Sequence, residues 1–219
     1  MYCTLYALSK GLNVMTTAIL AKRAIQLGGC HYHKLFCLPV GKNLSTHRKA
    51  ELAIIKLLKN PKELNTLLSL DVLVCDEMGQ ISAEFLATID IILRTLRETN
   101  VYLGGVLIIG TIDHTQIQPI EGRPFLTSTH VVSCFRMVAL SASVRASSDL
   151  PFQRIQEIAR YSHWRLKQNP SLVDEMIDLC SQNFTFVRDW NDPRIDPQTM
   201  RLYSKKFLKR KLQKILLQE

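Results

Sequence analysis

The segment from Asp71 to Glu77 constrains the fold of this chain most strongly. It reads DVLVCDE, so that four consecutive apolar residues run directly into two acids, Asp76 and Glu77. A short continuous apolar run predicts a strand that is buried on both faces, as in a parallel sheet. Such a strand delivers its two carboxylates at the carboxyl end of the sheet, where α/β folds place their functional sites.

Further strands and helices are predicted along the rest of the chain. Apolar patterning indicates strands at 12–18, 105–109 and 134–140, and helices at 2–9, 19–27, 50–58, 61–70, 85–96, 152–161 and 172–180. The segment 30–40 (CHYHKLFCLPV) is predicted as a loop. Connections of this length between strands imply parallel pairing, so we expect an α/β sheet with helices on both faces and a helical C-terminal segment. The predicted domains are 1–145 and 146–219.

Polar residues follow the predicted strands and suggest a chemistry. In phosphate chemistry, Asp76 would hold Mg²⁺ through water and Glu77 would orient and deprotonate an attacking water. Gln116, after the strand at 105–109, offers an amide for a terminal phosphate. Arg145, after the run at 134–140, offers a guanidinium with fixed charge and a planar set of donors. Taken singly, these residues are also compatible with an acidic turn, a loop glutamine and a surface arginine.

The charge of the chain favours a polyanionic partner. Its net charge is +9, with a dense basic stretch inside the predicted helix at 198–217. Positive charge of this size suits nucleic acid, although a basic surface without such a partner is the alternative. The six cysteines include no Cys-x-x-Cys pair, which predicts reduced thiols. We expect an intracellular protein, nuclear rather than cytoplasmic, that does not act in a membrane.

Taken together, four blocks resemble the Pif family of superfamily-one DNA helicases. They are LNVMTTAILAKRAIQLGGCHYHKLF, VLVCDEMGQIS, GTIDHTQIQPIEGRPF and LSASVRASSDLPFQRIQEIAR, in that order over roughly residues 10–165. The resemblance is nearest to Helitron-type transposon members. It implies a RecA-like domain of the P-loop NTPase class, ATP and Mg²⁺ as cofactors, and single-stranded DNA as a partner.

The resemblance also implies roles at matching positions. Asp76 would be the Mg²⁺-associated acid, Glu77 the catalytic base, Gln116 the γ-phosphate sensor and Arg145 the arginine that reaches the γ-phosphate. The residues along the single-strand path would be Thr16, Thr17 and His33. The family further implies ATP-driven unwinding, 5′ to 3′, with roles in repair and recombination by analogy.

Several positions depart from the family pattern. Cys30-His31 stands where two threonines are usual, Ile19-Leu20 replaces a Thr-Gly pair, and Thr111 replaces an acid. The sequence also contains no Gly-x-x-x-x-Gly-Lys-[Ser/Thr] loop, whose amides and lysine would cradle the phosphates. We therefore expect a fold that lacks its first strand and phosphate loop, in a fragment or degenerate copy that alone hydrolyses no ATP.

Three alternatives remain open from the sequence. The chain could be a non-catalytic, single-strand-binding remnant of a transposon helicase, or another phosphate-loop ATPase of similar topology. A zinc site is the third alternative, since Cys30, His31, His33 and Cys37 lie close together in the sequence. It is disfavoured, because the side chains of adjacent residues such as Cys30 and His31 cannot easily bind the same ion.

Overall fold

The structure, a computed structural model, describes residues 2–40, 44–113, 115–140, 144, 147–185 and 194. The chain forms two compact units, Met1–Ala139 and Leu140–Glu219. Arg145 and the basic stretch at 198–217 lie outside the described residues. The domain boundary predicted after residue 145 stays a prediction. In the described part of the chain, no helix combines the length and the apolar character needed to cross a membrane.

The first unit is built on a parallel sheet. Its strands run in the order β2-β1-β3-β4, and every pair is parallel. Their bounds are β1 Val14–Ala18, β2 Cys30–His31, β3 Val72–Asp76 and β4 Leu107–Gly110. The predicted parallel α/β sheet is thereby confirmed. The register sets Ala18 opposite Asp76 and Cys75 opposite Gly110, so the carboxyl ends of the three longer strands meet at one edge.

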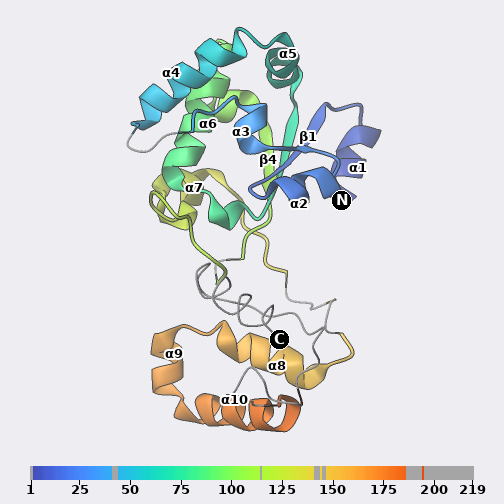
Figure 1. Cartoon of the computed structure of the whole chain (residues 1–219), viewed down its shortest axis with the longest axis vertical. Helices are drawn as coiled ribbons and strands as arrows, with labels where there is room; N and C mark the ends of the chain where they lie inside the picture. The colour runs from blue at the N-terminus through green and yellow to red at the C-terminus, as the bar shows by residue number, and fades with distance from the viewer. Residues whose placement is uncertain are drawn as a thin grey trace, which may run out of the picture. The chain divides into compact units, whose positions relative to one another are not determined.

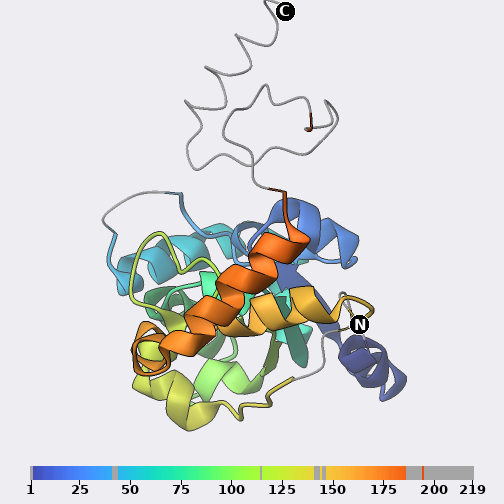
Figure 2. The same cartoon turned by 90° about the horizontal axis from the view of Figure 1, so that it is seen from below.

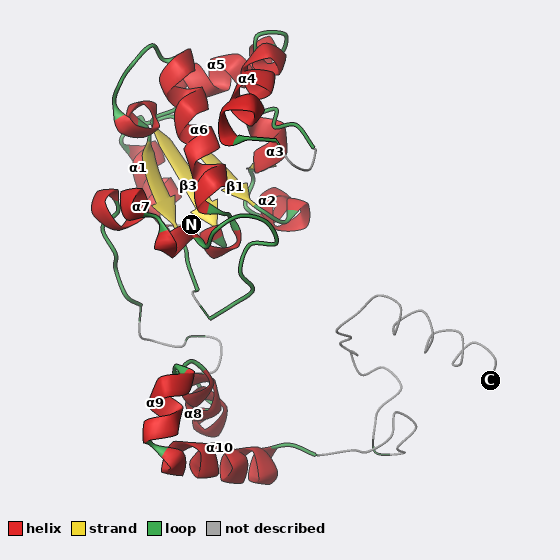
Figure 3. Ribbon diagram, turned by 90° about the vertical axis from the view of Figure 1, so that its left-hand side faces the viewer, coloured by secondary structure: helices red, strands yellow, loops and turns green. Residues whose placement is uncertain are grey.

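Helices flank this sheet on both sides (Figure 1). The first unit contains α1 Tyr2–Ser9, α2 Ala21–Gln26, α3 Tyr32–Leu35, α4 Thr46–Leu57, α5 Pro61–Ser69, α6 Ala83–Leu96 and α7 Thr129–Cys134. Short 3-10 turns lie at η1 Met78–Gln80, η2 Tyr102–Gly105 and η3 Phe125–Thr127. Helix α6 runs across the strands (Figure 3), and its apolar side closes the core through Leu86, Ile89, Ile92 and Leu93.

Serine side chains cap the N-termini of helices α4 and α6. Ser45 accepts a hydrogen bond from the backbone N–H of Arg48 at the start of α4, and Ser82 accepts one from Phe85 at the start of α6. Both serines satisfy an N–H group that a helix terminus leaves without an internal partner. The starts of both helices are therefore fixed by the local sequence.

Two predicted segments were wrong. The segment 30–40 is not a loop throughout, because it contains β2 and α3, and Tyr32, Leu35 and Phe36 are buried at helical spacing. The run at 134–140 is not a strand: α7 ends at Cys134, and residues 135–140 are without regular structure. Apolar character alone does not make a strand, since the backbone needs a neighbour to pair with.

The second unit contains α8 Leu150–Ala159, α9 His163–Gln168 and α10 Pro170–Asn183. Helices α8 and α10 lie side by side (Figure 2). Arg154 joins them, since its Nε and Nη2 atoms donate to the two carboxylate oxygens of Glu175 at 2.7 and 2.9 Å. The ring of Phe152 meets that of Phe184 edge to face, with 6.4 Å between centroids.

The connection from β3 to α6 carries backbone strain at Glu77. This residue has φ 55° and ψ 41°, in the left-handed region that costs a non-glycine residue about 1 kcal/mol or more. The strained geometry turns the chain sharply at the end of β3, so that the backbone N–H of Met78 reaches the carbonyl of Thr111 at 2.8 Å. Strain of this kind persists where the surrounding structure holds it in place.

Replacing Glu77 tests this strain. Glu77→Gly and Glu77→Ala both remove the carboxylate, but only glycine relieves the positive φ. We expect Glu77→Gly to be about 1 kcal/mol more stable than Glu77→Ala in chemical denaturation. As a control, Ala87→Gly in the exposed middle of α6 should lower stability by about 1 kcal/mol. Equal stabilities for the two Glu77 variants would contradict the assigned backbone conformation.

Candidate functional site

The site lies at the carboxyl edge of the sheet and centres on Asp76, the last residue of β3. The hydroxyl of Thr111, just after β4, donates to Asp76 Oδ1 at 2.6 Å. Arg23 Nε on α2 donates to Asp76 Oδ2, also at 2.6 Å. The carboxylate is 18% exposed and the Arg23 side chain 40%. Two other segments of the chain, α2 and the end of β4, are thus bonded to the side chain that ends β3.

The electrostatics of Asp76 follow from these contacts. Burial by itself would raise the pKa of its carboxyl, but the hydrogen bonds from Thr111 and Arg23 and the charge of Arg23 lower that pKa below its ordinary value. The same hydrogen bond and the charge of Asp76 raise the pKa of Arg23. Asp76 and Arg23 therefore form a carboxylate–guanidinium pair at neutral pH.

Glu77 stands beside this pair. Its backbone N–H donates to the Thr111 hydroxyl at 3.1 Å, and its carboxylate accepts from Gln80 Nε2 at 3.0 Å. Asp76 and Glu77 thus lie together at the strand end, as the sequence predicts. Sequence reasoning did not single out Arg23 or Gln80, although both lie within the blocks that carry the family resemblance, because no role followed from their residue type alone.

The predicted Mg²⁺ site does not fit Asp76 as it is arranged. Mg²⁺ keeps several waters and is bound through one or two carboxylates. Here each oxygen of Asp76 already accepts a hydrogen bond, and on Oδ2 the donor is itself a cation. Throughout the described ranges, no group of three His, Cys, Asp or Glu residues could hold a metal ion. We therefore derive no step through a metal.

Gln116 lies in the loop that leaves β4, at the same edge of the sheet. It is exposed, and its amide nitrogen donates to Asp113 Oδ2 at 3.1 Å. Within the described part of the chain its recorded side-chain partner belongs to this loop and not to Asp76 or Glu77. The assignment of Gln116 as phosphate sensor stays a prediction, as does that of Arg145, which lies outside the described residues.

Thr16 and Thr17, neighbours on β1, are both buried. Thr17 is fully buried, and its hydroxyl donates to the Val74 carbonyl at 3.3 Å, while Thr16 is 8% exposed. A side chain added at Gly29 would meet the Thr16 carbonyl oxygen at 1.9 Å, so the chain returning from α2 passes directly against β1. Thr17 thus links β1 to β3, and the predicted contact of Thr16 and Thr17 with a nucleic acid stays a prediction.

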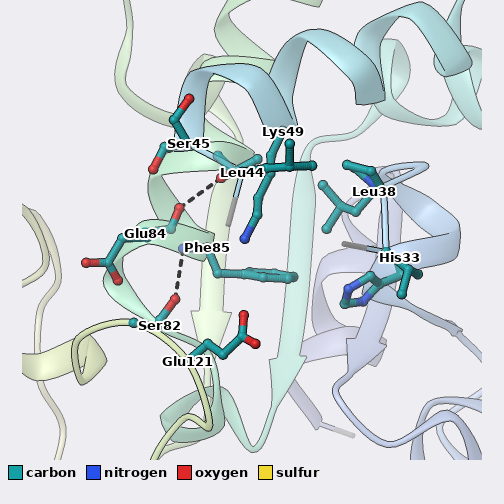
Figure 4. A pocket seen from close by; sticks show the side chains of 14 residues that line it. His33, Leu38, Leu44, Ser45, Lys49, Ser82, Glu84, Phe85 and Glu121 are labelled. Carbon is teal, nitrogen blue, oxygen red and sulfur yellow. Dashed lines mark hydrogen bonds between the residues drawn. The ribbon is translucent and has the colours of Figure 1, made fainter. Parts of the chain in front are cut away.

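His33 lines a pocket of about 860 Å³ (Figure 4). The pocket lies between α3, α4, the start of α6 and the loop at 121–122. The ring of Phe85 packs against Tyr32 edge to face at 5.5 Å and against His33 at 5.8 Å. Figure 4 shows the amine of Lys49 directed into the same hollow.

Of the charged residues that line this pocket, Glu84 has an ion-pair partner and Lys49 has none among the described residues. Glu84 accepts from Arg123 Nε and from the Arg123 backbone N–H, both at 2.9 Å, which holds the loop on α6. Lys49 forms no ion pair that the structure records among its described residues. Burial, followed by the nearby charges of His31 and Lys49, lowers the pKa of His33, so its ring is neutral at pH 7. Lys49 is therefore the charged donor of this pocket, and Phe85 and His33 are its ring surfaces.

Comparison with known proteins identifies the family. The sequence profile described as PIF1-like helicase matches residues 4–170. A relative from Trypanosoma brucei brucei (strain 927/4 GUTat10.1), named ATP-dependent DNA helicase PIF3, is 25% identical over 180 residues, which cover 81% of this chain and 20% of that protein. The chain thus spans about a fifth of this relative's length.

Solved structures support the same assignment at the level of the fold. Pif1 helicase from Candida albicans superposes with a TM-score of 0.62 at 20% identity, over 71% of this chain and 36% of that one. Bacteroides Pif1 bound to ssDNA gives 0.61 at 21% identity, over 83% and 42%. Bacteroides sp Pif1 in complex with ADP-AlF4 gives 0.56 at 21% identity, over 76% and 41%. The predicted RecA-like fold is confirmed, and the chain belongs to the PIF1-like helicase family.

Proposed function

We propose that this chain is part of an ATP-dependent DNA helicase and contributes the surface that holds single-stranded DNA. In the whole protein, ATP hydrolysis would drive unwinding, 5′ to 3′, and the biological setting would be repair or recombination in the nucleus. The observation that carries the proposal is the pocket at His33, where a cation and an aromatic ring share one hollow within a PIF1-like domain.

The pocket chemistry suits a single strand. Nucleobases stack on exposed aromatic rings in a way that does not depend on sequence, and lysines neutralise the phosphates. Phe85 offers the ring and Lys49 the charge, while the start of α4 at Ser45 lines the same space. Glu121 at the rim offers an acceptor for an exocyclic amine of a base. Solved structures of Bacteroides Pif1 in complex with ssDNA support this partner class.

Nucleotide chemistry needs more than this chain supplies. A Bacteroides Pif1 structure is described as a complex with ADP-AlF4, which supports nucleotide use in the family. Glu77 is the candidate catalytic base in this proposal, but the sequence carries no phosphate-binding loop. The alternative, a non-catalytic remnant of a transposon helicase that binds single strands, follows from the same absence.

ATP turnover distinguishes a competent motor from a fragment. We expect the purified chain of 219 residues to hydrolyse ATP at the rate of the Glu77→Gln variant, because no lysine-bearing loop holds the phosphates. A coupled phosphate-release assay, with and without single-stranded DNA, measures this. Turnover above that of Glu77→Gln would show that the chain completes a nucleotide site by itself.

Two substitutions in the pocket test DNA binding. Lys49→Gln should weaken binding of a fluorescent oligothymidylate and reduce the slope of log K against log salt by about 0.7, the value for one phosphate contact. Phe85→Leu should cost about 1 kcal/mol or more in lost stacking and leave that slope unchanged. Fluorescence anisotropy over a range of salt concentrations measures both quantities.

The matched control is Lys56→Gln. Lys56 is an exposed lysine of the same helix α4 and does not line the pocket. Its replacement removes the same charge and should leave the slope close to that of the unmodified chain. If Lys49→Gln and Lys56→Gln behave alike, binding is a general effect of the basic surface and the pocket is not the DNA site.

A further inference from the structure

Arg23 reaches Asp76 because of the sheet register. Ala18 lies opposite Asp76, and α2 begins only three residues after Ala18, at Ala21. Arg23, in the last turn of α2, is therefore directed back towards the end of the neighbouring strand. Its Nε lies 2.6 Å from Asp76 Oδ2, although the two residues are 53 positions apart in the sequence.

The neighbouring carboxylates of Asp76 and Glu77 stabilise the charged guanidinium of Arg23. The charge of Glu77 adds to that of Asp76 in raising the pKa of Arg23. Thr111 donates a neutral hydroxyl to the other oxygen of Asp76, so the charged partner that the structure records for this carboxylate among its described residues is Arg23. An arginine keeps its charge at every ordinary pH, and its planar group matches a carboxylate edge.

A divalent ion competes poorly for this carboxylate. Mg²⁺ gives up its water shell reluctantly and normally relies on substrate phosphates in addition to protein oxygens. Arg23 is part of the chain, so its effective concentration at Asp76 is high. Two positive charges cannot share one oxygen at close range without strong repulsion.

We propose that Arg23 is an internal cation that takes the place of a divalent metal ion at Asp76. In the described arrangement the strand end is held by an arginine–carboxylate pair, and Asp76 takes up no Mg²⁺ while Arg23 is in place. Removal of the guanidinium opens the carboxylate to hard divalent ions. This inference concerns metal binding alone and does not depend on the proposed DNA or ATP functions.

Mn²⁺ tests the proposal directly, because it takes the same oxygen ligands as Mg²⁺ and broadens nearby NMR signals. The amide signals of Asp76 and Glu77 are followed in the full chain as Mn²⁺ is added. In the Arg23→Gln variant, we expect the Mn²⁺ concentration that halves these signals to fall by about fivefold or more relative to the unmodified chain. The double variant Arg23→Gln/Asp76→Asn should lose this increase in sensitivity to Mn²⁺.

Arg48→Gln is the matched control. It removes an arginine from an exposed pair with Glu51 on α4 and should leave the Asp76 signals unchanged. Should Arg23→Gln fail to fold, Arg23→Met keeps the aliphatic stem without the charge and gives the same readout. Broadening at Asp76 in the unmodified chain equal to that in the Arg23 variant overturns the proposal. The proposal is also overturned if the Asp76 and Glu77 signals of the Arg23 variant do not broaden when Mn²⁺ is added.

Discussion

The carboxylate of Asp76 is the point on which the arrangement of this sheet edge depends. Its two oxygens are held by Thr111 and Arg23, both at 2.6 Å, from segments 35 and 53 residues away. Thr111 also receives the backbone N–H of Glu77 on its hydroxyl and that of Met78 on its carbonyl. The ends of β3 and β4 and the helix after β1 are thus fastened together. The strained backbone of Glu77 is held between these contacts.

This edge and the pocket at His33 share one physical origin. Parallel strands end on the same side of a sheet, and the helices and loops that follow them converge there. The pocket is lined by α3 after β2, by α6 after β3 and by the loop after β4. The pocket and the Asp76–Glu77 strand end are therefore both formed by segments that follow the strands of one sheet.

The sequence predicted those parts of the fold that depend on local pattern. The run DVLVC and the segment at 105–109 predicted β3 and β4, because strands buried on both faces are apolar throughout. The same criterion failed at 134–140, where the apolar run pairs with no strand in the part of the chain that the structure describes. Helix α3 was missed because its four residues are too few to establish a period. Asp76 and Glu77 were found together, since adjacency in sequence guarantees it.

The contacts that define the site were not predictable from pattern. Arg23 reaches Asp76 because the register of β1 against β3 sets Ala18 opposite Asp76. Phe85 resembles any apolar residue of an amphipathic helix, and Lys49 any helical lysine, until packing brings both to one hollow. The burial of Thr17 against β3 likewise follows from the pairing of the strands and not from local pattern.

A double-mutant cycle between Thr111 and Asp76 tests most directly whether this carboxylate fastens the sheet edge. Thr111→Val, Asp76→Ala and the double variant are compared with the unmodified chain in chemical denaturation. A hydrogen bond to a partly buried carboxylate predicts a coupling energy of about 1 kcal/mol between the two sites. Effects that simply add, within about 0.3 kcal/mol, would show that the two side chains act independently and would contradict this account.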